Sequence, residues 1–286
     1  MTTERKFTID EIGAALAESR YIADEGLCAA VFVALSLGRP LLVEGAAGVG
    51  KTEIAKAMAT VLGRQLVRLQ CHVGIDETRA VYEWNYQKQL LAIQAGRKEG
   101  EEDVMHSIFT NEYLLERPLL KSIRSEQPVV LLIDEIDKTD EEFEAFLLEL
   151  LAEYQITIPE LGTMQAITKP FTVLTSNNAR PLSDALRRRC AYAWIDYPGV
   201  EKELAIIRAR NPGADEILAR DVAEAVAALR ENQRILKKPS IAETLDWVAA
   251  LEAFGAKRLD RTAAEATVSA VLKNNRDAEE ALNAFS

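Results

Sequence analysis

The chain alternates between short unbroken hydrophobic runs and longer stretches in which hydrophobic residues recur at helical spacing. This alternation predicts an α/β fold. Residues 40–44, 129–133 and 171–175 are mostly aliphatic or β-branched runs of strand length. Such runs are typical of parallel strands that are buried on both faces of a sheet. We therefore predict that all three belong to one parallel sheet.

A helix is predicted after the first of these strands and the glycine-rich loop that follows it. Over residues 53–62, hydrophobic residues fall at i, i+4, i+7 and i+8 and so share one helix face. They are Ile54, Met58, Val61 and Leu62. We expect Gly63 to end this helix, because glycine favours the backbone conformation of a helix terminus.

The second strand is also followed by a predicted helix. Thr139 and Glu142 have the spacing of a capping box, in which a threonine side chain caps the helix that begins after it. A hydrophobic stripe continues from there, at positions Phe143, Phe146, Leu147, Leu150 and Leu151.

The chain divides into three predicted regions. Residues 1–20 are expected to form a short leading helix, and residues 21–200 the α/β domain. Residues 201–286 are rich in Ala and Glu with helical periodicity, which predicts a helical domain. Asn, Pro, Gly and Ser break that domain into separate helices at 211–213 and 238–240.

The segment 76–128 is too long for a simple connection, so we predict that it carries an insertion in the α/β domain. An acidic run, Glu99-Gly100-Glu101-Glu102-Asp103, lies within it. A charge run is usually a solvated face, and a mobile loop tip is the alternative interpretation.

The composition limits the classes of protein to consider. A chain of 286 residues with 48% hydrophobic residues has room for one large and one small globular domain. The net charge of −11 argues against non-specific nucleic-acid binding, because phosphate neutralisation needs clustered Lys and Arg. No hydrophobic stretch approaches the roughly 20 residues of a membrane span, and the start of the chain lacks a signal-peptide core. We expect a cytoplasmic protein with no nucleic-acid partner and no membrane span.

Cysteine and histidine do not indicate a metal site. Cys28, Cys71 and Cys190 are far apart with no C-x-x-C pair, which is typical of reduced cytosolic thiols. His72 and His106 have no partners at ligand spacing, so we interpret both as ordinary core or surface residues.

The loop after the first strand has the pattern G-x-x-x-x-G-K-[ST] of a phosphate-binding loop. Its residues are Gly45, Ala46, Ala47, Gly48, Val49, Gly50, Lys51 and Thr52. Glycines let the backbone N–H groups turn inward, and with the N-terminus of the next helix they form a nest for phosphates. Lys51 can reach the β- and γ-phosphates, and the Thr52 hydroxyl can bind Mg²⁺. The competing interpretation is a turn that binds nothing, but the order strand, loop, helix favours the phosphate site.

Asp134 and Glu135 follow the second strand directly. Ligand chemistry in a parallel α/β sheet occurs at the carboxyl ends of the strands. In a chain with a phosphate loop, two carboxylates there indicate a Walker B site. Asp134 would hold Mg²⁺ through water, and Glu135 would orient and deprotonate the attacking water. Alone, the pair could simply begin a solvated turn.

Two further polar groups follow the third strand. Asn177 stands at its end, where an amide can hydrogen bond to the attacking water or the γ-phosphate, although Asn also favours turns for its own reasons. Arg187, Arg188 and Arg189 follow in an otherwise acidic chain. An arginine supplied by a neighbouring subunit can stabilise a transferring phosphoryl group. A solvated basic turn or an ion-pair cluster is the alternative.

The phosphate-binding loop (Walker A), the Walker B carboxylates, the strand-end Asn and the arginine cluster follow one another in the chain. This ordered set resembles the AAA+ ATPases over about residues 20–255. The resemblance implies a three-layer αβα P-loop NTPase core with a C-terminal α-helical lid, and ATP and Mg²⁺ as cofactors.

Within AAA+, the chain is similar to the MoxR branch. Residues 21–25 look like the segment that precedes the phosphate loop there, and residues 156–167 resemble the β-hairpin inserted in this clade. Residues 238–247 resemble the lid signature of a MoxR subgroup. Residues 74–79 and 82–86 look most like the CoxD-type ATPases, which are associated with maturing the metal centre of carbon monoxide dehydrogenase.

The resemblance also implies roles for single residues and partners. Asn177 would be the sensor 1 residue and Arg189 the arginine finger, with Arg188 its nearest rival. Glu53 and Ile22 would join the phosphate loop in binding the nucleotide. Family members form hexameric rings with the nucleotide at subunit interfaces. They commonly work with a von Willebrand factor A domain protein as chaperones that activate a metalloenzyme client.

One position departs from the family pattern. Many AAA+ proteins have a sensor 2 Arg at the start of a lid helix, where this chain has Lys237, Lys238 and Pro239. Lys238 is a candidate substitute as a point charge, but it lacks the guanidinium fork. The sensor 2 residue therefore stays open.

Three functions compete. The first is an oligomeric AAA+ ATPase that remodels a protein client. The second is a nucleic-acid motor or a restriction-type GTPase, against which the acidic balance argues. The third is a non-catalytic adaptor gated by nucleotide, against which Glu135 argues because a scaffold needs no water-activating carboxylate.

Overall fold

The structure, a computed structural model, describes residues 7–99 and 108–283. The chain forms two compact units. One, which we call the loop unit, consists of Met1–Ala29, Gly45–Ala57 and Trp194–Ser286. The other, the sheet unit, consists of Ala30–Glu44 and Met58–Ala193. The three predicted regions do not have these boundaries, and they stay a prediction.

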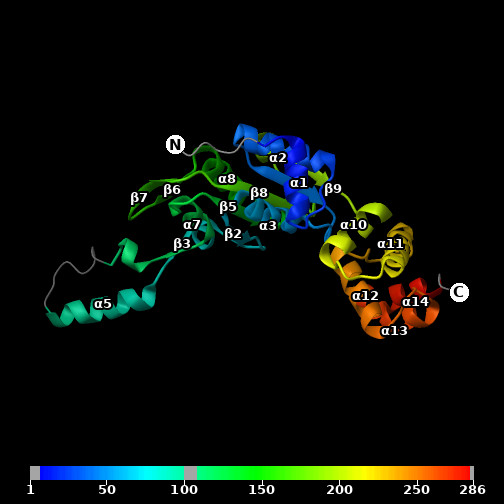
Figure 1. Cartoon of the computed structure of the whole chain (residues 1–286). Helices are drawn as coiled ribbons and strands as arrows, with labels where there is room; N and C mark the ends of the chain where they lie inside the picture. Colours follow the sequence, from blue (N-terminus) through cyan, green and yellow to red (C-terminus); the bar gives the residue numbers. More distant parts are fainter. Residues whose placement is uncertain (1–6, 100–107, 284–286) are drawn as a thin grey trace. The chain divides into compact units, whose positions relative to one another are not determined.

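The central sheet has five strands in the order β2-β5-β8-β1-β9. Figure 1 labels β2, β5, β8 and β9 of this sheet. The strands are β1 (Leu41–Gly45), β2 (Gln65–Gln70), β5 (Val129–Asp134), β8 (Phe171–Ser176) and β9 (Ala191–Ile195). The pairs β2–β5, β5–β8 and β8–β1 are parallel. Every residue of β1, β5 and β8 is buried, because helices flank the sheet. The three predicted strands and their parallel arrangement are confirmed.

The helix predicted after the glycine loop is confirmed, and a second helix precedes β1. The helix α3 (Lys51–Leu62) starts within the glycine loop and ends at Gly63, whose φ is +62°, as predicted. The helix α2 (Glu25–Leu37) begins after Asp24, whose side chain accepts a hydrogen bond from the backbone N–H of Leu27 at 2.8 Å.

The capping box predicted at Thr139 is wrong by one residue. The helix α8 (Glu141–Glu153) is capped by Asp140, whose carboxylate accepts a hydrogen bond from the N–H of Phe143 at 2.9 Å. The Thr139 hydroxyl instead donates to the carbonyl of Ile136 at 2.8 Å, closing the short 3₁₀ turn Ile136–Lys138. Asp is as good an N-cap as Thr, so two adjacent capping residues leave the helix start ambiguous in sequence.

The predicted hairpin is present. Strands β6 (Gln155–Ile158) and β7 (Gly162–Gln165) pair antiparallel, and Gly162 has a φ of +81° where the chain reverses. The hydroxyls of Thr157 and Thr163 lie 3.0 Å apart across the two strands.

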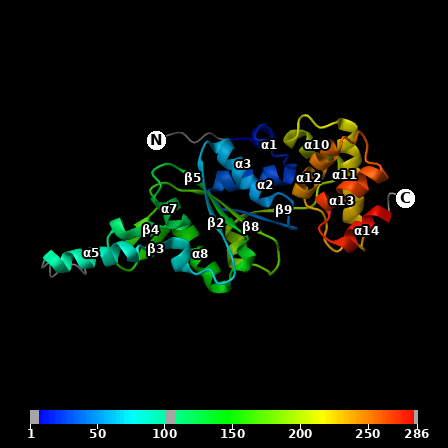
Figure 2. The same ribbon diagram turned by 90° about the horizontal axis from the view of Figure 1, so that it is seen from below.

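The segment between α3 and β5 carries structure of its own. After the short helix α4 (Glu77–Val81), strands β3 (Tyr82–Trp84) and β4 (Leu114–Glu116) pair antiparallel. The helix α5 (Tyr86–Glu99) leaves from β3 and extends away from the sheet (Figure 2). The helix α7 (Pro118–Arg124) then packs against β2 and β5. His106 and the acidic run after Glu99 lie outside the described residues.

The loop unit contains the predicted helical region. Its helices are α10 (Val200–Arg210), α11 (Glu216–Glu231), α12 (Ile241–Phe254), α13 (Arg261–Val271) and α14 (Asn275–Asn283). The breaks at 211–213 and 238–240 fall between α10 and α11 and between α11 and α12, as predicted. The core of this bundle is centred on Trp247, which is fully buried and donates from Nε1 to the Thr267 hydroxyl at 2.9 Å.

The predicted leading helix is α1 (Ile9–Glu18), which is shorter than residues 1–20. Thr8 and Glu11 form a capping box at its start. Across the described residues, no helix is long and apolar enough to cross a membrane. All three cysteines are free thiols and buried.

Candidate functional site

The phosphate-loop motif has the local structure that the sequence predicts. The motif begins at the end of β1 and continues into α3, so the predicted order of strand, loop and helix is confirmed. Gly45, Gly48 and Gly50 have φ values of +154°, +78° and +92°, which side-chain-bearing residues rarely adopt. The glycines therefore set a backbone path that turns N–H groups inward beside a helix N-terminus, which is an anion nest.

Lys51 is folded onto the loop. Its Nζ donates to the carbonyl of Gly45 at 2.9 Å and to that of Ala46 at 2.6 Å, and the residue is only 6% exposed. The cation is thus buried at the loop with carbonyl partners that a phosphate oxygen can outcompete as a charged acceptor. Thr52 is the second residue of α3 and is half-buried.

The remaining predicted nucleotide residues also lie in the loop unit. Val49 is buried. Glu53, in the first turn of α3, pairs with Lys56 at 2.5 Å and with Arg210 of α10 at 2.9 Å. Ile22 is half-buried in the short segment between α1 and α2. None of these contacts tests nucleotide binding, so their roles stay predictions.

The loop is packed against the start of α12. The backbone N–H of Ile241 donates to the Gly48 carbonyl at 3.0 Å, and the Tyr197 hydroxyl donates to the Ala47 carbonyl at 3.4 Å. A Cβ on Gly48 would overlap the side chain of Ser240, the N-cap of α12. The loop's carbonyls are therefore held by groups from the helical part of the same unit.

A buried ion pair supports this contact. Arg230 donates to both carboxylate oxygens of Glu203, at 2.6 and 3.1 Å, and its Nε donates to the Pro239 carbonyl at 2.9 Å. Its guanidinium also lies 4.8 Å from the centre of the Tyr197 ring. Arg230 therefore contacts both Pro239, which precedes the α12 cap, and Tyr197, which contacts the phosphate loop.

The lysines at the expected sensor 2 position are engaged within the helical bundle. Lys238 donates from Nζ to the Asn232 carbonyl at 2.7 Å, and the Lys237 Nζ lies 3.6 Å from Glu243. A role for Lys238 as sensor 2 stays a prediction.

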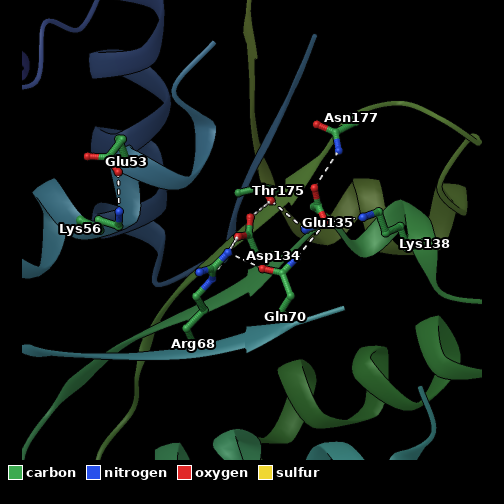
Figure 3. Close-up of polar contacts among 9 residues, drawn as sticks. All are labelled: Glu53, Lys56, Arg68, Gln70, Asp134, Glu135, Lys138, Thr175 and Asn177. Carbon is green, nitrogen blue, oxygen red and sulfur yellow. Dashed lines mark hydrogen bonds and ion pairs between the residues drawn. The ribbon is translucent and has the colours of Figure 1, made fainter. Parts of the chain in front are cut away.

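In the sheet unit, Asp134 stands at the carboxyl end of β5, as predicted, and is 2% exposed (Figure 3). The Thr175 hydroxyl on β8 donates to its Oδ1 at 2.5 Å. Arg68 on β2 donates to its Oδ2 from Nη2 at 2.5 Å and from Nε at 3.1 Å. The buried carboxylate is therefore both hydrogen-bonded and charge-compensated, as a buried charge requires.

Glu135 follows in a left-handed backbone conformation, with a φ of +58°. Its Oε2 accepts from Gln70 at 2.7 Å and from Lys138 at 2.6 Å, and its Oε1 accepts from the Asn177 amide at 3.3 Å (Figure 3). The hydrogen bond to Glu135 raises the pKa of Lys138. The strained backbone and three donors fix the direction of one carboxylate, which is a feature of functional sites.

Sequence reasoning brought Asp134, Glu135 and Asn177 to one place correctly, but it missed four neighbours. From the sequence, Thr175 is simply a strand residue, and the motif patterns do not include Arg68, Gln70 or Lys138. A signal exists for two of them. Over residues 65–70, buried Val67 and Leu69 alternate with exposed Arg68 and Gln70, so both polar side chains leave the same face of β2.

The arginine cluster forms the last turn of α9 (Asp184–Arg189). Arg189 donates to the Leu148 carbonyl at 2.7 Å, and Arg187 lies 3.5 Å from the buried carboxylate of Glu44. Arg188 and Arg189 line a cavity of about 240 Å³. Within residues 7–99 and 108–283, neither hydrogen bonds to Asp134 or Glu135. The arginine-finger role stays a prediction.

The residues present fit ATP with Mg²⁺ by their chemistry. A hydroxyl from Thr52 and a carboxylate from Asp134 are hard oxygen donors, which Mg²⁺ prefers, and the ion usually takes its other ligands from phosphates and water. No group of three His, Cys, Asp or Glu side chains in the described part of the chain could hold a metal alone.

Comparison with known proteins gives an independent result. Residues 40–190 match the AAA domain family, dynein-related subfamily. The chain is 26% identical over 236 residues to the gas vesicle ATPase GvpN of Ancylobacter aquaticus, an alignment that covers 76% of this chain and 62% of that protein. It is 21% identical over 231 residues to an uncharacterised protein of Staphylococcus haemolyticus, covering 77% and 78% of the two chains.

Proposed function

The chain belongs to the dynein-related subfamily of AAA domains, and from that membership we propose that it hydrolyses ATP to ADP and phosphate with Mg²⁺. The observation that carries the proposal is Glu135, a carboxylate aimed by Gln70, Lys138 and Asn177 beside the buried Asp134. A nucleotide-binding module without turnover has no use for a carboxylate oriented in this way.

Each motif has a role in this proposal. The loop N–H groups and Lys51 bind the phosphates, while Thr52 and Asp134 hold Mg²⁺, which would neutralise charge on the transferring phosphoryl group. Glu135 accepts the proton of the attacking water. Asn177 keeps Glu135 in place and donates toward the same water.

We further propose that the protein works as a ring, with six subunits as the expected number. Arg189, with Arg188 as its rival, would stabilise the transition state at a neighbouring subunit's nucleotide. The support for this part is that both arginines lie in the last turn of α9 and line one cavity.

The purpose of turnover is proposed from the resemblance to the MoxR branch and its CoxD-type members. The β6–β7 hairpin supports the clade, because the sequence resemblance placed an inserted hairpin at that position. On this proposal the ring remodels or matures a metalloenzyme client in the cytoplasm, with a von Willebrand factor A domain protein as partner. The relative named as a gas vesicle ATPase supports the ATPase part only.

The test is phosphate release by the purified protein over a range of protein concentrations. Wild type should turn over ATP, with a specific activity that rises with concentration as rings form. Glu135→Gln should bind ATP but release phosphate at least about a hundredfold more slowly, which is a typical general-base effect. Glu142→Gln, on the exposed face of α8, is the matched control and should behave as wild type.

Arg189→Ala and Arg188→Ala separate the two candidate fingers. The true finger variant should lose turnover, and mixing it with Lys51→Ala should restore part of it, because each variant supplies what the other lacks. Wild-type turnover by both arginine variants would contradict the trans mechanism.

A pull-down with Glu135→Gln as bait tests the client. In the presence of ATP this variant should stay in the bound state and retain the client protein.

A further inference from the structure

Both oxygens of the Walker B aspartate already have partners. Oδ1 of Asp134 accepts from Thr175, and Oδ2 accepts from two nitrogens of Arg68. A carboxylate oxygen has two lone pairs, so Arg68 alone fills Oδ2. The carboxylate is 2% exposed, and Arg68 brings a positive charge to it.

Arg68 differs from an ordinary buried counter-ion because its side chain is 48% exposed. It stands on β2, which pairs with β5 in a register that sets Arg68 beside Leu132 and Gln70 beside Asp134. The Arg68 guanidinium therefore extends from the solvent side to Asp134, which lies beside the residue two positions further along β2. It has a second acceptor, Oε1 of Gln70, so it can leave Asp134 without losing all of its hydrogen bonds.

Mg²⁺ and the guanidinium carry charges of the same sign. A cation held by Asp134 beside an unmoved Arg68 would face a unit positive charge at hydrogen-bonding distance from the same carboxylate, which is costly at a poorly hydrated site. Whether Mg²⁺ is held directly or through water, the two cations therefore compete for this carboxylate.

We propose that Arg68 is a resident counter-ion that competes with Mg²⁺ for Asp134, and that it thereby sets the Mg²⁺ concentration at which the site loads nucleotide. The inference rests on the proposed function, because it assigns Asp134 to Mg²⁺. Arg68 stabilises the metal-free site and withdraws to Gln70 and solvent when the metal arrives. It is a positioning residue and takes no part in bond making.

A purely structural ion pair makes a different prediction. Its loss would destabilise the free and the loaded protein equally. Competition predicts that loss of Arg68 costs more stability in the metal-free state than in the loaded state, because only the metal-free carboxylate depends on the charge that Arg68 brings.

The experiment measures binding of a fluorescent ADP analogue, carrying an N-methylanthraniloyl group, by anisotropy while free Mg²⁺ is raised from EDTA. The readout is the Mg²⁺ concentration at half-maximal binding. The variants are Arg68→Gln and Arg68→Lys. The control is Arg117→Gln, because Arg117 has the same 48% exposure and pairs with Glu83, away from this motif.

Arg68→Gln should lower the Mg²⁺ midpoint about fivefold, the size of effect expected when a half-exposed ion pair no longer competes. Arg68→Lys keeps the charge but not the fork, so its midpoint should lie between those of Arg68→Gln and wild type. Arg117→Gln should not move it. In thermal unfolding, Arg68→Gln should lower the midpoint more in EDTA than in Mg²⁺ and ADP.

An unchanged or raised Mg²⁺ midpoint in Arg68→Gln overturns the inference, as does equal destabilisation with and without Mg²⁺ and ADP. If Arg68→Gln does not fold, Arg68→Lys decides, and a wild-type midpoint overturns the inference. Failure of the wild-type protein to bind the analogue at any Mg²⁺ concentration instead overturns the proposed function.

Discussion

Gly48 of the phosphate loop lies against Ser240, the cap of α12, so closely that a Cβ on the glycine would overlap the serine side chain. The Gly48 carbonyl also accepts from the N–H of Ile241. Gly48 thus has two constraints, a φ of +78° and a neighbouring side chain that leaves no room for a Cβ. The motif glycine is required for packing as well as for the shape of the nest.

Gly48→Ala should therefore destabilise the protein by about 2–4 kcal/mol, the sum of backbone strain and overpacking. Nucleotide affinity should fall as well, since the loop must shift away from α12. Urea unfolding and binding of the fluorescent ADP analogue measure the two effects.

Gly63→Ala is the control for strain alone, because Gly63 has a φ of +62° with no atom within 4 Å of its added Cβ. Because alanine is strained in the left-handed region, Gly63→Ala should cost about 1 kcal/mol and leave nucleotide affinity unchanged. Equal losses in the two variants would show that contact with Ser240 has no energetic weight.

Arg230 and Glu203 give a second prediction. The two side chains are 7% and 2% exposed, so removing one leaves an uncompensated buried charge. Arg230→Met should cost about 3–5 kcal/mol in urea unfolding. The double variant Arg230→Met, Glu203→Leu should recover most of this loss, because it removes both charges.

The matched control is the exposed pair of Arg220 and Glu201 on the same helical bundle, at 43% and 77% exposure. Arg220→Met should change stability by less than about 1 kcal/mol. A double variant no more stable than Arg230→Met would show that Arg230 acts through Pro239 and Tyr197 rather than through the ion pair.

Sequence reasoning succeeded where one pattern fixes one local structure. Unbroken aliphatic runs predicted β1, β5 and β8, since only a strand in a sheet that is covered on both faces buries every side chain. The glycine motif gave the loop and α3. Thr139 failed as the cap of α8 because Asp140 is an equally good cap one position on.

The neighbours of the two carboxylates were harder to predict. Arg68 and Gln70 reach them across the sheet, and that contact depends on the β2–β5 register, which no local pattern in one sequence specifies. The ion pair of Arg230 is also not indicated by any local pattern. Its partner Glu203 is 27 residues away on another helix, so no helical spacing connects them.

Gln70 allows a third prediction, about the direction of Glu135. Gln70→Ala removes one of three donors to that carboxylate, so the general base should be less well oriented. We expect kcat for ATP hydrolysis to fall about tenfold with no change in nucleotide affinity, the loss of roughly one oriented hydrogen bond.

Gln65→Ala on the same strand is the control, because Gln65 is exposed and lies at the other end of β2. It should leave kcat unchanged. A rise in kcat for Gln70→Ala would contradict the prediction and show that Gln70 holds Glu135 away from its productive direction.

The thiol of Cys190 gives a prediction for alkaline pH. Burial raises its pKa from an ordinary value of 9.0 to about 12, partly opposed by the nearby charge of Arg39. The folded protein therefore keeps a proton that the unfolded chain releases above pH 9. Because the folded pKa is the higher one, this contribution to stability is complete below pH 9 and is lost as pH rises toward 12.

Urea unfolding at pH 8, 9, 10 and 11 should show this loss as a slope. Above pH 9, wild type should lose about 1.4 kcal/mol per pH unit more than Cys190→Ala, which is the value for one proton. Below pH 9 the two proteins should differ by a constant amount, which reflects packing rather than ionisation. Parallel curves over the whole range would mean that the Cys190 thiol ionises as readily in the folded protein as in the unfolded chain. Iodoacetamide labelling of Cys190 at pH 8, compared with and without urea, checks the same point, since only the thiolate reacts and the native thiol should resist.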